Sequence, residues 1–179
     1  MFNSILRACM QTYLLTCISL LYSFKITDVK SKEGIVSLTL ALLTLVYVIG
    51  CPIFSVMFLY RKKENQLREP DVKAKYDSLY QNVDYYKKKA LQSTSWFFVR
   101  RFFFAGVIVF CTSSIVLQIF LADVLSTCML IYFITVKPMN TSLNNLTQIL
   151  NEIFVLISVW LMFHFTEFVN DPVTRYHLA

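Results

Sequence analysis

The stretch IVSLTLALLTLVYVIGCPIFSVMFLY, residues 35–60, decides the fold class of this chain because it contains no charged side chain. A helix needs about 20 consecutive apolar residues to cross the hydrocarbon core of a bilayer, and this stretch is longer than that. Gly50 and Pro52 interrupt its second half. Because proline leaves the carbonyl of Val48 without its usual helical hydrogen bond, we expect either a tolerated bend or a hinge there. Residues 35–60 therefore predict a membrane-spanning helix.

The segment that follows, residues 61–101, carries most of the positive charge. It holds eleven of the seventeen Lys and Arg residues against five Asp or Glu residues, an excess equal to the formal net charge of +6. Membrane proteins keep such basic loops on the cytoplasmic side. We therefore expect a cytoplasmic loop, a cytoplasmic N-terminus and a C-terminus on the opposite side.

The composition supports a membrane protein. The chain is 56% hydrophobic, 16% aromatic and 16% charged, whereas soluble domains carry about 25% charged residues. A soluble domain of roughly 150 residues buries only about 70% of its unfolded surface, which is too little to hide so much apolar area. Because the basic excess lies beside apolar segments, we expect membrane lipids, above all anionic ones, as partners and no nucleic acid. The five cysteines form no C-x-x-C pair, which indicates small apolar side chains rather than a metal site or a disulfide framework.

The apolar stretches predict an all-α membrane protein, a bundle of about five transmembrane helices in one domain, residues 1–179. A signal peptide is the rival interpretation of the first stretch, but aromatic residues near its end favour a helix. The stretch 102–136 is too long for one span, because such a helix would reach about 52 Å across a core of about 30 Å. Gln118 and Asp123 predict a turn inside it, with Asp123 capping the next helix. The expected spans are residues 5–24, 35–60, 102–118, 120–136 and 146–168.

The basic loop of residues 61–101 has its own pattern. Residues 73–90 contain no proline or glycine, and apolar side chains recur there at Tyr76, Leu79, Tyr80 and Val83. This spacing predicts an amphipathic helix on the cytoplasmic side, either an elbow that lies on the membrane or part of a solvated loop. Candidates for lipid or interface binding, all expected at the membrane surface, are Lys87, Lys88, Lys89, Trp96, Arg100 and Arg101.

Three polar residues fall inside the predicted spans: Gln118, Asn151 and Glu152. A carboxylate in lipid is costly, so Glu152 must face protein, water or the headgroups. It lies about one turn inside the predicted fifth span. Two interpretations therefore stay open, a side chain that reaches the interface, and one that serves an ion path or a bond between helices.

The sequence carries no enzyme signature. Three glycines do not form a phosphate-binding loop, and the two histidines lack a third ligand at metal spacing. We therefore predict that the chain is not an enzyme and holds neither a cofactor nor a metal.

Short motifs in the loop and the spans suggest a family. Residues 75–80 read K-Y-D-S-L-Y, and residues 97–105 read F-F-V-R-R-F-F-F-A. Together with Leu-Gln-Ile at residues 117–119, Lys-Pro at 137–138 and Asn-Glu at 151–152, this pattern resembles the C-terminal transmembrane region of TRP-like and polycystin-like multi-span membrane proteins of protists and fungi. The resemblance covers most of the chain.

The resemblance implies a channel or mechanosensory role, in a plasma or ciliary membrane. Proteins of that family carry large extracellular repeats before the spans and continue into at least one more span beyond the part that matches residues 165–169. The chain is therefore expected to be a shortened relative or part of a longer protein. The alternative is a non-catalytic accessory subunit that packs with other membrane subunits in a larger complex, such as a respiratory assembly of the mitochondrial inner membrane.

Overall fold

Eight helices make up the regular structure of the described chain. The computed structural model describes residues 2–26, 32–62, 64–67, 69–84 and 86–164. In chain order the helices are α1 (Phe2–Ile26), α2 (Lys32–Arg61), α3 (Glu64–Leu67), α4 (Pro70–Tyr80), α5 (Lys88–Leu91), α6 (Ser93–Phe110), α7 (Ile115–Val136) and α8 (Ser142–His164). The predicted all-α fold class is confirmed.

Among the described residues, five helices are long and apolar enough to cross a bilayer, which identifies a multi-pass membrane protein and confirms the expected number of about five spans. The third, fourth and fifth spans begin earlier than predicted, and residues 165–168 of the predicted fifth span lie outside the described residues. The spanning stretches are Asn3–Ile26, Gly34–Arg61, Lys89–Phe110, Ile115–Val136 and Ser142–His164.

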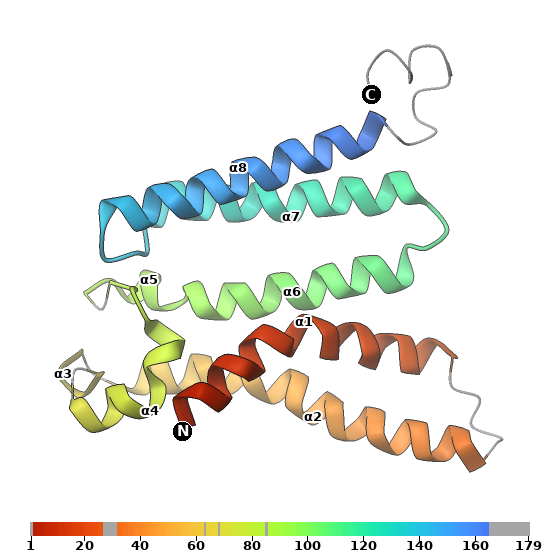
Figure 1. Ribbon diagram of the computed structural model, residues 1–179, viewed down its shortest axis with the longest axis horizontal. Helices are drawn as coiled ribbons and strands as arrows, with labels where there is room; N and C mark the ends of the chain where they lie inside the picture. Colours follow the sequence, from red (N-terminus) through yellow and green to blue (C-terminus); the bar gives the residue numbers. More distant parts are fainter. Residues whose placement is uncertain (1, 27–31, 63, 68, 85, 165–179) are drawn as a thin grey trace.

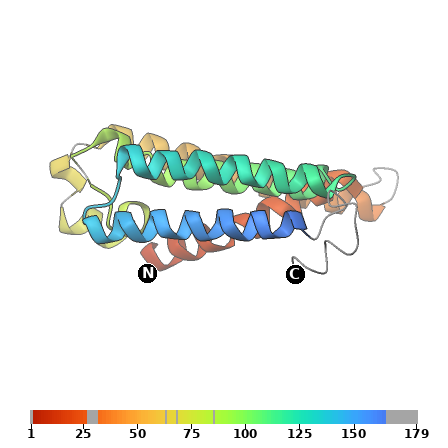
Figure 2. The same cartoon turned by 90° about the horizontal axis from the view of Figure 1, so that it is seen from above.

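Helix α6 lies at the centre of the arrangement (Figure 1). Helices α1 and α2 pack on one side of it, and the α7–α8 hairpin lies on the other. The long helices share the long axis of the molecule in the turned view as well (Figure 2). The N-terminus, the α2–α6 connection and the α7–α8 turn gather at one end, and the α6–α7 turn lies at the other. Spans that alternate in direction place successive connections at opposite ends of the bundle, as seen here. Which end faces the cytoplasm stays a prediction.

The α2–α6 connection folds over one end of the bundle. We use the term end cap for α3, α4, α5 and the described residues that join them. Its apolar contacts centre on Leu67, Leu79 and Tyr80, which are buried together with Leu59 of α2. The Tyr80 hydroxyl donates to the Leu67 carbonyl at 3.1 Å, and the Thr94 hydroxyl of α6 donates to the Leu79 carbonyl. The end cap is therefore packed onto α2 and α6.

Helix α4 is shorter than the amphipathic helix expected over residues 73–90. It ends at Tyr80, after which Asn82 takes a left-handed φ of 64° that stops helical geometry. Val83 then pairs as an isolated bridge with Met139 in the α7–α8 turn. The buried side of this segment was predicted in part, since Leu79, Tyr80 and Val83 are all buried.

The turn between the third and fourth spans lies at residues 111–114, so its prediction at Gln118 and Asp123 is wrong. Helix α7 begins at Ile115 and runs continuously past both residues. Ser114 is its N-cap, and its side chain accepts from the Leu117 N–H at 3.3 Å. A short hydroxyl residue, rather than a charged one, sets this helix start.

Helix α2 continues through Pro52 without a break. The carbonyl that the proline leaves free, that of Val48, accepts a hydrogen bond at 2.9 Å from the hydroxyl of Tyr13 in α1. Both Tyr13 and Val48 are buried. The freed carbonyl is thus tied to a neighbouring helix, which favours the tolerated bend over a free hinge.

Candidate functional site

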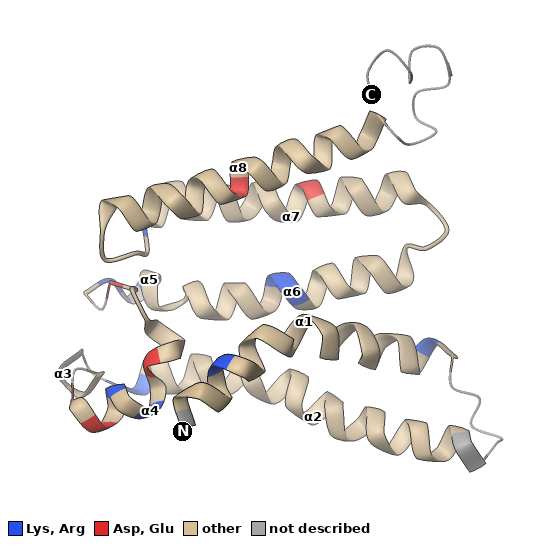
Figure 3. Ribbon diagram, viewed as in Figure 1, with Lys and Arg blue, Asp and Glu red and all other residues tan. Residues whose placement is uncertain are grey.

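Arg100 and Arg101 lie well inside α6 rather than at its entrance. The helix begins at Ser93, and the apolar stretch that includes it begins at Lys89. Figure 3 shows the basic segment in the middle of α6, with one acidic position along each of α7 and α8. The structure thus places both arginines within the third apolar stretch, and their contact with the membrane interface stays a prediction. The aromatic residues before them belong to the span itself.

Arg100 joins three helices near the middle of the bundle. Its Nη1 lies 2.5 Å from Glu152 Oε1 of α8, and its Nη2 donates to the Ser126 hydroxyl of α7 at 3.2 Å. The side chain of Glu152 is 8% exposed and that of Arg100 is 26% exposed. Charged groups inside membrane helices are stabilised by such pairing.

The surroundings of Glu152 match one of its two interpretations, a bond between helices. Helix α8 begins at Ser142, four residues before the predicted start, so Glu152 lies near mid-helix and not one turn inside. Its carboxylate faces protein and pairs with Arg100, as a bond between helices requires. Its Oε2 is buried and, within the described ranges, has no hydrogen-bond partner. The carboxylate therefore keeps an unused acceptor inside the bundle.

Arg101 binds in the opposite direction from Arg100. Its Nη1 donates to the Met10 carbonyl of α1 at 2.7 Å, and its guanidinium carbon lies 3.9 Å from the centre of the Phe97 ring. A guanidinium over an aromatic face is stabilised by the ring's negative potential. Adjacent arginines thus link α6 to α1 on one side and to α7 and α8 on the other.

The other predicted site residues are spread over the molecule. Gln118 donates from Nε2 to the Ile108 carbonyl at 3.3 Å, across the α6–α7 turn, and Asn151 is exposed on α8. Trp96 is 47% exposed, and its ring centre lies 6.3 Å from that of Tyr132. In the described part of the chain, none of these three side chains forms a hydrogen bond with Arg100 or with the residues that bind it.

The three predicted lysines lie at the end cap. Lys87 forms an exposed ion pair with Asp84 at 3.6 Å, and Lys89 is exposed. The side chain of Lys88 lies outside the described residues. Their place beside the first turn of α6 is compatible with an anionic lipid surface, and lipid binding stays a prediction.

Asp123 is a site residue that sequence reasoning assigned to a turn. It lies inside α7, and its Oδ1 accepts a hydrogen bond at 2.9 Å from Trp160 Nε1 of α8. A cavity of about 490 Å³ between α7 and α8 is lined by Asp123, Trp160 and His164, among others. An acidic residue inside a long apolar run is the signal that would have found it.

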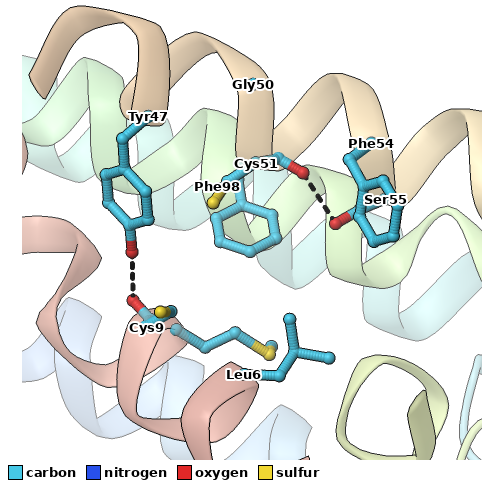
Figure 4. Close-up of a pocket in the computed structure, with 9 residues that line it drawn as sticks. Leu6, Cys9, Tyr47, Gly50, Cys51, Phe54, Ser55 and Phe98 are labelled. Carbon is cyan, nitrogen blue, oxygen red and sulfur yellow. Dashed lines mark hydrogen bonds between the residues drawn. The ribbon is translucent and has the colours of Figure 1, made fainter. Parts of the chain in front are cut away.

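A second, smaller cavity of about 210 Å³ lies between α1, α2 and α6 (Figure 4). Its polar groups are already engaged, because the Tyr47 hydroxyl donates to the Cys9 carbonyl and the Ser55 hydroxyl to the Cys51 carbonyl, each at 2.9 Å. This cavity therefore offers an apolar surface. In the described part of the chain, no group of three or more His, Cys, Asp or Glu side chains is arranged to hold a metal ion.

The five spans and the polar contacts between them define an all-α, multi-pass membrane protein with paired charges in its interior. A comparison with known protein families, curated proteins and solved structures finds no match to this chain.

Proposed function

We propose that the chain is the transmembrane region of a TRP-like channel or mechanosensory protein, and that the Arg100–Glu152 pair is its working element. The single observation that carries the proposal is this ion pair near the middle of two spans. Charged residues at such depth are costly, and they mark ion paths and moving sensors in membrane proteins. The resemblance of the loop and span motifs supports the same class.

In this proposal the two arginines of α6 hold two parts of the bundle together. Arg101 secures α1, and Arg100 secures α7 and α8. Breaking the Arg100–Glu152 contact frees the α7–α8 hairpin to shift, while α1 stays attached to α6. The pair therefore has the properties of a latch between two arrangements.

The end cap offers a route by which force reaches that latch. It contacts α1 through Ser78, whose N–H donates to Asn3 Oδ1 at 2.9 Å. It also contacts the α7–α8 turn, where the Asp84 N–H donates to the Pro138 carbonyl at 2.9 Å. A pull on the end cap, or lipid binding at its lysines, thus acts on both parts of the bundle. We propose that it faces the cytoplasm below a plasma or ciliary membrane.

Purification and flux measurements test this proposal. The tagged chain is purified in mild detergent and reconstituted, and ion flux is compared for the unchanged chain, Glu152→Gln and the control Ser158→Ala. Ser158 is on the same helix, and its hydroxyl donates to the Phe154 carbonyl of that helix. We expect a self-associated oligomer that conducts, with flux changed by Glu152→Gln only. An oligomer without flux, or equal flux in all three, would refute the channel.

The second candidate function is a non-catalytic accessory subunit of a larger complex, such as a respiratory assembly of the mitochondrial inner membrane. It is favoured by two observations. Only 6% of the apolar stretch of α8 is buried, and Asp123 of α7 lines an outward-facing cavity beside α8. In the same purification, co-elution with many different membrane subunits would support it.

A further inference from the structure

The cavity of about 490 Å³ between α7 and α8 is lined mostly by apolar side chains. Asp123 and Thr127 line it from α7, and Ile153, Ile157, Trp160 and His164 line it from α8. These positions follow the three- and four-residue spacing of one helix face, so they form a continuous strip. Trp160 is 66% exposed although its indole binds the Asp123 carboxylate. The groove is therefore apolar, open and acidic at one point.

A carboxylate at this depth requires a cation. Asp123 lies eight residues beyond Ile115, about 12 Å along the helix axis and thus near the centre of the hydrocarbon core. The indole N–H is its one hydrogen-bond partner among the described residues. A neutral donor does not compensate a negative charge in lipid.

The described cations of the span interior are engaged elsewhere. Arg100 binds Glu152 and Ser126, and Arg101 binds the Met10 carbonyl. A second copy of the described chain therefore supplies no free mid-membrane cation. A lipid headgroup lies at the membrane surface, well above Asp123, whereas a side chain on a spanning helix reaches this depth without distortion.

We propose that the α7–α8 groove binds a transmembrane helix of another protein, one that carries a Lys or Arg near its middle which pairs with Asp123. The apolar strip on α8 packs the helix, and the charge pair selects it and sets its register. The proposal is independent of the Arg100–Glu152 latch, because the residues that line the groove do not include Arg100, Glu152 or Ser126.

A tryptophan-quenching experiment tests the proposal on the full chain. Trp96→Phe leaves Trp160 as the single tryptophan, since the sequence has two. The protein is placed in nanodiscs that contain lipid brominated on its acyl chains, which quenches exposed indoles. The probe is a tryptophan-free leucine–alanine transmembrane peptide with one central Lys, and its match has Leu there. A docked helix shields Trp160 from the quencher.

We expect the Lys peptide to bind about 5- to 30-fold more tightly than the Leu peptide. Asp123→Asn should remove this preference while leaving the helix content unchanged, because the amide oxygen still accepts from the indole, and Asp123→Glu should keep it. If Asp123→Asn does not fold, the comparison of the Lys and Leu peptides on the unchanged protein still tests the proposal. Equal binding of the peptides, or a preference that survives Asp123→Asn, overturns the proposal.

Two further outcomes assign the groove to another occupant and also overturn the proposal. One is protection of Trp160 by dodecylamine, with no preference for the Lys peptide, which indicates a cationic amphiphile. The other is self-association without peptide that Asp123→Asn abolishes, which indicates a second copy of the chain.

Discussion

Removing either partner of the Arg100–Glu152 pair should destabilise the protein by more than half of the loss that follows when both are removed. Stranding one charge of a buried pair costs about 3–5 kcal/mol, whereas replacing both by neutral residues costs less than the two single losses together. Arg100→Gln strands a carboxylate that is 8% exposed, so we expect a loss of about 4 kcal/mol in the free energy of unfolding. Glu152→Gln strands a guanidinium that is 26% exposed and keeps Ser126, so we expect about 2 kcal/mol.

The double variant separates a coupled pair from two independent residues. We expect Arg100→Gln with Glu152→Gln to cost about 3 kcal/mol, which corresponds to a coupling of about 3 kcal/mol. The assay is reversible unfolding in mixed micelles, followed by tryptophan fluorescence, with Ser158→Ala as the control on the same helix. If the double variant loses the sum of the single losses, within about 0.5 kcal/mol, the pair is not coupled and the reasoning fails.

Three other predictions concern the core, the topology and the end cap. Tyr13→Phe should lower the free energy of unfolding by about 1–3 kcal/mol, because it leaves the buried Val48 carbonyl without its donor. The loss should be clearly smaller when Pro52→Ala restores the helical N–H to that carbonyl. Equal losses with and without Pro52→Ala would contradict the assignment of this hydrogen bond. After the native thiols are blocked, Ala74→Cys should be labelled only from the cytoplasmic side and Ser113→Cys only from the other; labelling of both from one side would exclude five alternating spans. Changing the three lysines at residues 87–89 to Gln should weaken binding of a peptide that contains them to anionic vesicles by up to about 3 kcal/mol. Binding that does not fall as the salt concentration rises would contradict this prediction.

The number of spans was predictable from the sequence, because apolar length alone separates residues 35–60 and the other stretches from their surroundings. Their boundaries were less so. Gln118 and Asp123 were taken as turn residues because polar side chains are rare inside spans. In the structure they form hydrogen bonds with the Ile108 carbonyl and the Trp160 indole, and Ser114 begins the helix. Such partners hold a polar side chain inside a helix, and the local pattern does not reveal them.

The candidate site was predictable as a set of residues and not as an arrangement. Glu152 was selected because a carboxylate in a span needs a partner, and a bond between helices was one of its two interpretations. Arg100 was selected too, but as an interface anchor. The two come together because α6 starts earlier than its apolar core suggests and α8 lies parallel to it. That pairing spans 52 positions, which no local pattern encodes.

The distance in sequence between Arg100 and Glu152 also has a consequence for how the protein enters the membrane. A ribosome completes α6 and α7 before the Glu152 carboxylate exists, because α8 follows them in the chain. Two arginines near the centre of a helix raise the free energy of translocon-mediated insertion by about 5–7 kcal/mol. At that stage Arg101 has its partner, the Met10 carbonyl of α1, whereas Arg100 has the neutral Ser126 hydroxyl of α7 and not yet its carboxylate. We therefore expect α6 to remain beside the translocon until α8 emerges, so that α6, α7 and α8 enter the membrane as one unit.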